Sequence, residues 1–227
     1  MEIVLIAGLW LEASAWDAVV PALRSHGHRV TPVSLPGQGA PPENATLEDQ
    51  QRAVLNALDA AEDAAMLVAH SAAATLAWMA CDARPAGVAR VVMVGGFPSG
   101  DGAEYAPMFE IVDGAMPFPG WPAFEGPDAA DLDPSRRRAI AAAAVPVPEG
   151  VARGRVHLAD KRRYGVPVTL VCPEYSADDA RGWIESGQVP ELARARSVDY
   201  VEIDSGHWPM FTRPTELAAL LHTISVR

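Results

Sequence analysis

The stretch Met66-Leu67-Val68-Ala69-His70-Ser71-Ala72-Ala73-Ala74 decides the fold of this chain. An apolar run ends at His70, and an alanine-rich run of high helix propensity begins after Ser71. The pattern is typical of a buried strand that turns sharply at one serine into a helix, and the small Ala69 and Ala73 let strand and helix approach closely. Such a turn projects the serine hydroxyl from the edge of a sheet. Ser71 is therefore a candidate nucleophile, and its alternative role is that of a helix cap.

Strands and helices alternate on both sides of this stretch. We expect strands over residues 2–7, 28–35, 65–69, 88–94, 166–172 and 199–203. We expect helices over residues 46–61, 72–82 and 214–224, and an earlier helix that starts at Ser14 and stops at His26-Gly27. This order predicts the α/β class, with an open, mostly parallel sheet of about six strands and helices on both faces.

The chain length of 227 residues fits a single domain, residues 1–227. The alternation lapses between Gly95 and Gly165, where proline, glycine and aromatic residues are frequent and one further helix is expected over 136–144. Long irregular segments of this kind are usually functional. We predict a cap or lid insertion at approximately residues 98–164, over the carboxyl ends of the strands, where open α/β sheets bind ligands.

Composition excludes several classes of partner. The formal net charge of −11 repels nucleic acid and anionic lipid surfaces. No run approaches the roughly 20 apolar residues of a membrane span, and no signal-peptide pattern is visible, so we expect a cytoplasmic protein with no membrane partner. Cys81 and Cys172 show no disulfide or metal spacing, and the histidines form no ligand cluster, so no metal is expected. A homodimer is one possible assembly.

A histidine follows the last expected strand, in the stretch Ile203-Asp204-Ser205-Gly206-His207-Trp208-Pro209. An imidazole titrates near neutral pH, so it can take a proton from a serine hydroxyl and return it to a leaving group. Serine precedes histidine along the chain, and each follows a strand, as in hydrolases built on α/β sheets. We therefore predict His207 as the general base for Ser71.

With these residues, the chain resembles the α/β-hydrolase superfamily over nearly its whole length, and most of all its small cofactor-independent esterase and hydroxynitrile-lyase-like branch. The resemblance is carried by Ile6-Ala7-Gly8-Leu9-Trp10, Ala15-Trp16, Leu35-Pro36-Gly37-Gln38-Gly39, Ala69-His70-Ser71, Gly206-His207-Trp208 and Arg213-Pro214. Ala7 replaces the family's usual histidine, and Ala69 and Ala73 replace its usual glycines. The resemblance implies that no cofactor is needed, and that the backbone N–H groups of Leu9 and Ala72 hold the oxyanion.

The family's third catalytic residue is normally an aspartate after the second-last strand. Here that loop reads Cys172-Pro173-Glu174-Tyr175-Ser176-Ala177-Asp178, and Ser176 stands where the acid is expected. Glu174 is the first candidate, because it directly follows the strand and its longer side chain compensates for a shifted attachment point. Asp178 is the second candidate, and Asp101, after the preceding strand, is the third.

Aromatic and apolar residues favour a small, largely apolar substrate. The side chains expected to contact it are those of Trp10, His70, Met108, Phe109, Trp121 and Trp208. We predict a serine hydrolase that cleaves a carboxylic ester or lactone through an acyl-Ser71 intermediate. Two alternatives stay open: a lyase or cyclase on the same fold, and a small-ligand-binding protein with a degenerate triad.

Overall fold

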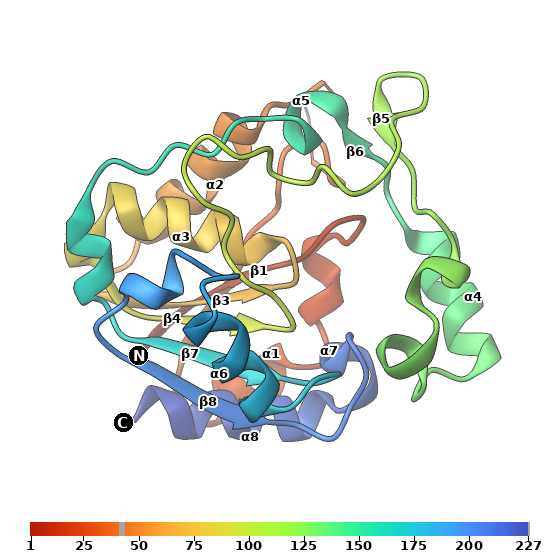
Figure 1. Ribbon diagram of the computed structural model, residues 1–227. Coiled ribbons are helices and arrows are strands. Elements are labelled where there is room, and N and C mark those ends of the chain that lie inside the picture. Colours follow the sequence, from red (N-terminus) through yellow and green to blue (C-terminus); the bar gives the residue numbers. More distant parts are fainter. Residues whose placement is uncertain (41–43, 227) are drawn as a thin grey trace.

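The computed structural model describes residues 1–40 and 44–226. Its centre is a six-stranded sheet in the order β2-β1-β3-β4-β7-β8 (Figure 1), and every neighbouring pair in it is parallel. The strands are β1 (Glu2–Ile6), β2 (Arg29–Pro32), β3 (Ala65–His70), β4 (Val88–Val94), β7 (Val168–Cys172) and β8 (Val198–Glu202). The predicted α/β class and the mostly parallel sheet are confirmed.

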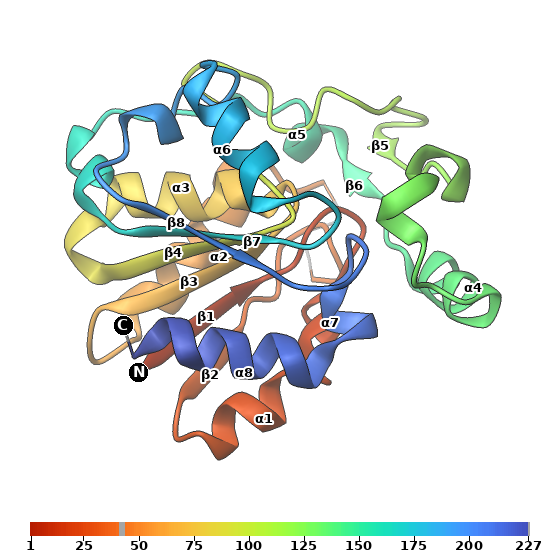
Figure 2. The ribbon, with the colours of Figure 1, turned by 60° about the horizontal axis from the view of Figure 1, so that its bottom comes forward.

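Helices cover both faces of the sheet. Alternate side chains of a strand point to opposite faces, so in β1 Val4 and Ile6 join one core while Ile3 and Leu5 join the other. The first core also contains buried residues of α2 (Leu47–Asp59), α3 (Ala73–Ala83) and α6 (Ala177–Glu185). The second contains those of α1 (Val20–Ser25) and α8 (Pro214–Ser225), which lie together on one side of the sheet in Figure 2.

The prediction of one helix from Ser14 to His26 was wrong. The chain instead forms a 3-10 turn over Ala13–Trp16 and then the short helix α1. Pro21 explains the break, because proline lacks an N–H and its ring clashes with the carbonyl four residues earlier in a continuous helix. Trp16, Val19 and Leu23 are nevertheless fully buried, as their apolar spacing indicated.

The segment between β4 and β7 carries short elements of its own. They are the antiparallel pair β5 (Ala115–Met116) and β6 (Val147–Pro148), and the helices α4 (Pro134–Ala143) and α5 (Glu149–Ala152). Helix α4 lies at the outer edge of the molecule, away from the sheet (Figures 1 and 2). The cap boundaries at 98 and 164 stay a prediction. Within residues 1–40 and 44–226, no helix is both long and apolar enough to cross a membrane.

A buried ion network fixes the far end of α3. The Arg163 guanidinium lies 2.9 Å from the Asp82 carboxylate and 2.8 Å from that of Glu191, and its side chain is only 4% exposed. Asp82 also accepts hydrogen bonds from the backbone N–H groups of Ala159 and Asp160. The network therefore ties the chain that returns from the insertion to α3, the helix that begins just after Ser71.

Glu191→Gln should lower the free energy of unfolding by about 3 kcal/mol, because it leaves part of a buried arginine's charge uncompensated. Asp59→Asn is the matched control, since Asp59 pairs with Arg84 at the surface, and its effect should stay below about 1 kcal/mol. Urea unfolding followed by circular dichroism measures both. Equal effects of the two substitutions would contradict the structural role of the network.

Candidate active site

Ser71 sits in a strained turn between β3 and α3. Its φ is 55°, a left-handed conformation that residues other than glycine seldom adopt. The Ser71 N–H donates to the Val94 carbonyl at the end of β4, at 2.8 Å. Gly96 lies so close that a Cβ there would come within 2.2 Å of the Ser71 carbonyl oxygen. The neighbouring strand end and the missing side chain at Gly96 thus accommodate the turn.

Ser71, His207 and Glu174 form a hydrogen-bonded chain. His207, on the loop between β8 and α7 (Pro209–Thr212), places Nε2 2.9 Å from the Ser71 Oγ and Nδ1 2.6 Å from the Glu174 Oε1. The His207 and Glu174 side chains are 13% and 12% exposed. Because Nδ1 bonds a carboxylate, it carries the proton of the neutral ring, and Nε2 is left to accept from the serine hydroxyl.

The two other candidate acids lie elsewhere. Asp178 is in the first turn of α6, with its side chain 91% exposed and paired with Arg181. Asp101 accepts a hydrogen bond from the Leu158 backbone N–H at 2.9 Å. Ser176 caps α6 by accepting from the Asp179 N–H. Of the three carboxylates named from the sequence, Glu174 is the one that the structure brings to His207.

A cavity of about 260 Å³ opens beside Ser71. It is lined by Leu9, Trp10, His70, Ser71, Ala72, Gly95, Gly96, Phe97, Met108, Phe109, Phe124, His207 and Trp208. Trp121 is not part of this lining. Its indole N–H donates to the Arg137 carbonyl, and its ring meets that of Trp208 edge to face, with ring centroids 5.4 Å apart. The other five side chains expected to contact substrate do line the cavity.

Sequence reasoning missed Phe97 and the glycines before it as lining residues. Phe97 stacks on Tyr175 with ring centroids 5.5 Å apart and meets Trp183 edge to face. The signal was present in the sequence, because Gly95-Gly96-Phe97 directly follows β4, and the carboxyl ends of parallel strands meet at one edge of the sheet.

Trp10 joins the loop after β1 to the segment between β4 and β7. Its φ is 64°, so it shares the left-handed strain of Ser71. Its indole N–H donates to the Met116 carbonyl at 3.1 Å, and its own carbonyl accepts from the Val145 N–H at 3.0 Å. Edge-to-face contacts with Phe109, Phe118 and Phe124 surround the ring.

Leu9 and Ala72, whose backbone N–H groups the family resemblance implies as oxyanion donors, both line the cavity beside Ser71. Within the described residues, neither group donates to another backbone carbonyl outside the regular helices and strands. Each of the two residues adjoins a residue in the left-handed conformation: Leu9 precedes Trp10, and Ala72 follows Ser71. Backbone N–H groups that are left without a carbonyl partner at a cavity are the kind of donor that stabilises a developing negative charge.

Neither cysteine is suited to nucleophilic chemistry. Cys81 and Cys172 are free and buried. Burial raises the pKa of each thiol to about 12, so both stay protonated near neutral pH. Burial also raises the pKa of the Tyr175 phenol, which therefore stays neutral beside Glu174. Of Cys81, Cys172, Tyr175 and Ser71, it is Ser71 whose side chain lies within hydrogen-bonding distance of a base, the His207 Nε2.

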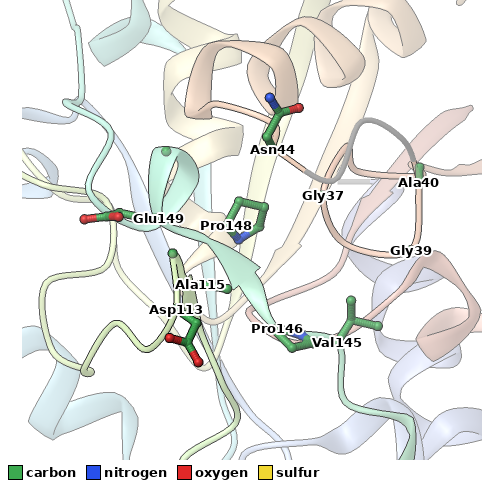
Figure 3. A pocket seen from close by; sticks show the side chains of 12 residues that line it. Gly37, Gly39, Ala40, Asn44, Asp113, Ala115, Val145, Pro146, Pro148 and Glu149 are labelled. Atoms are coloured by element: carbon green, nitrogen blue, oxygen red, sulfur yellow. The ribbon is translucent and has the colours of Figure 1, made fainter.

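A second cavity, of about 860 Å³, lies between Gly37–Ala40 and the β6–α5 region (Figure 3). Pro146, Pro148 and Asn44 border it, and it shares no lining residue with the cavity beside Ser71. The hydrogen-bonded serine and histidine therefore border the smaller cavity and not this larger one.

Among residues 1–40 and 44–226, no group of three or more His, Cys, Asp or Glu side chains is arranged to hold a metal ion.

Comparison with known proteins agrees with this geometry. The model of the alpha/beta hydrolase family matches residues 3–220. The chain belongs to this family. The family predicted from the sequence is therefore confirmed.

Individual relatives cover almost the whole chain. Methylesterase 7 of Arabidopsis thaliana is 28% identical over 256 aligned positions, which cover 99% of this chain and 96% of that protein. An extracellular α/β-hydrolase from a Paenibacillus species, described as sharing structural and functional homology with tobacco salicylic acid binding protein 2, superposes with a TM-score of 0.81 at 21% identity and covers 98% of each chain. The Arabidopsis methylesterase MES16 gives a TM-score of 0.74 at 16% identity, with 100% of both chains covered.

Gly96→Ala should lower the free energy of unfolding by about 2 kcal/mol, because its Cβ would collide with rigid backbone at Ser71. Gly100→Ala is the control, since a Cβ at Gly100 would meet nothing within 4 Å, and its effect should stay below about 1 kcal/mol. Urea unfolding compares the two variants. A Gly96→Ala protein as stable as the native chain would mean that the close approach does not constrain the Ser71 turn.

Proposed function

We propose that this protein is a serine esterase that hydrolyses carboxylic esters, lactones included, of small, largely apolar compounds. The observation that carries the proposal is the continuous chain from Glu174 through His207 to Ser71, with distances of 2.6 Å and 2.9 Å, at the wall of a cavity. The methylesterase among the relatives supports an ester as the substrate. Neutral esters, including methyl esters, are therefore the first compounds to test.

In the proposed reaction the Ser71 Oγ attacks the ester carbonyl while its proton passes to the His207 Nε2. Glu174 accepts a hydrogen bond from Nδ1–H, which fixes the tautomer of the ring and stabilises the imidazolium that forms. The backbone N–H groups of Leu9 and Ala72 bind the oxyanion of the tetrahedral intermediate. Preorganised donors of this kind contribute on the order of 3 kcal/mol to the stabilisation of a transition state.

The intermediate collapses by cleavage of the bond between the carbonyl carbon and the alcohol oxygen. His207 returns its proton to this oxygen, and the alcohol leaves as a neutral molecule. Water then attacks acyl-Ser71 by the same route, with its proton passing through His207, and the free acid departs. The alcohol side of the substrate must face His207, so Trp208 and Phe124 are placed to contact it.

The cavity wall favours uncharged substrates. Apart from the two histidines, its lining residues carry no ionisable side chain. A charged group on the substrate would lose its hydration without gaining an ionic partner there, which is costly. Apolar and aromatic groups on the ester gain from burial instead.

Ser71→Ala and His207→Gln should each lower kcat for 4-nitrophenyl butyrate by about a thousandfold or more, since each removes one member of a cooperating set. Glu174→Gln should cost about a hundredfold or more, because an amide can stabilise the wrong tautomer of His207. Asp178→Asn, which removes an exposed carboxylate in the first turn of α6, should keep native activity. Release of 4-nitrophenol, followed by its absorbance, or release of methanol from aromatic methyl esters measures these rates.

Full activity of Ser71→Ala would overturn the proposal. Tight binding of apolar esters by the native protein without release of any alcohol would instead support the binding-protein alternative.

A further inference from the structure

His70 is a buried histidine next to the proposed nucleophile. It is the last residue of β3 and is only 1% exposed. Its Nε2 lies 2.8 Å from the backbone carbonyl oxygen of His207, and the two imidazole rings are 4.8 Å apart. Because a carbonyl oxygen only accepts hydrogen bonds, Nε2 must carry the proton of the neutral His70 ring.

This hydrogen bond is one of four that hold the main chain and the ring of His207. The His207 carbonyl accepts from His70, and the His207 N–H donates to the Asp128 carbonyl at 2.7 Å. The ring nitrogens are engaged by Glu174 and Ser71. Every polar group of His207 therefore has a partner, and the partners come from three segments: the end of β3 with Ser71, the loop after β7, and the inserted segment at Asp128.

The opposite edge of the His70 ring faces the loop after β1. His70 Nδ1 is buried and has no hydrogen-bond partner among the described residues. A Cβ at Gly8 would lie 2.7 Å from this atom, so the ring packs directly against Gly8. Gly8 precedes Leu9, the proposed oxyanion donor. The imidazole thus fills the space between the oxyanion loop (Gly8–Trp10) and the base loop (Ile203–Trp208).

The ring is held neutral by its surroundings. Burial, reinforced by the positive charge that His207 acquires, keeps the pKa of His70 well below the ordinary histidine value. A second proton would fall on Nδ1, which has Gly8 rather than an acceptor in front of it. His70 is consequently unable to take over the proton transfer, since one nitrogen is committed to a carbonyl and the other is enclosed.

We infer that His70 is a positioning residue that fixes the main chain of His207 relative to the oxyanion loop. The inference rests on the proposed esterase function. A serine hydrolase needs its base and its oxyanion donors at a set separation, because an error of about 1 Å can cost about a hundredfold in rate. A rigid, neutral ring between the two loops supplies that separation, because one edge packs against Gly8 and its single N–H holds the His207 carbonyl.

The first test compares His70→Gln, whose amide can still donate to the His207 carbonyl, with His70→Leu, which fills the space without a donor. Activity is expressed per active site, counted by fluorophosphonate labelling. His70→Leu should lose about 30-fold in kcat with KM changed less than about threefold, and His70→Gln should recover most of that loss. A residue that only supports folding would change the melting temperature and the number of active sites, but not kcat per site.

Native kcat per site in His70→Leu would overturn the inference while leaving the esterase function intact. An inactive native protein would instead overturn the proposed function.

The second test needs no variant activity. In native protein labelled with ¹⁵N-histidine, two-bond ¹H–¹⁵N correlations should show His70 as the Nε2–H tautomer, assigned by its loss in His70→Gln. The Nδ1–H tautomer would overturn the inference, because Nε2 could then not donate to the His207 carbonyl.

Discussion

The turn at Ser71 holds a residue other than glycine at a φ of 55°, and the geometry of the whole site follows from it. Strain of this kind costs about 1–3 kcal/mol and persists only where the surroundings impose it. Here the Ser71 N–H is bound by Val94, and Gly96 offers no side chain to collide with the turn. The fully buried Ala69 and Ala73 pack β3 and α3 together on either side. The serine hydroxyl is consequently directed out of the sheet toward His207.

A second strained residue, Trp10, borders the same cavity. It links the loop after β1 to Met116 and Val145 in the segment that follows β4. Two further aromatic residues of the cavity wall, Phe109 and Phe124, contact Trp10 edge to face, next to the proposed oxyanion donor Leu9. His207 is likewise held from two sides, by His70 of the sheet and by Asp128 of the inserted segment. The site depends on contacts between the sheet and the insertion, and not on the sheet alone.

Local patterns in the sequence were sufficient for the sheet and for the positions of Ser71 and His207, because strand ends and tight turns have short-range signals. Glu174 was favoured over Asp178 because it directly follows β7, and the structure places it at His207. The sequence could not reveal the carbonyl of Asp128 as a partner of His207, since any residue type supplies a carbonyl. The absence of Trp121 from the cavity lining and the break before Pro21 were missed because both depend on packing and sterics beyond the apolar spacing.

The central claim is that His207 and the strained turn make Ser71 a reactive nucleophile. Labelling the native protein with a fluorophosphonate, followed by peptide mass spectrometry, tests it most directly. The Ser71 Oγ should displace fluoride and form one phosphonyl adduct, on the peptide that contains Ser71, and His207→Gln should abolish the adduct. An adduct on another residue, or no adduct on a folded native protein, would contradict the account.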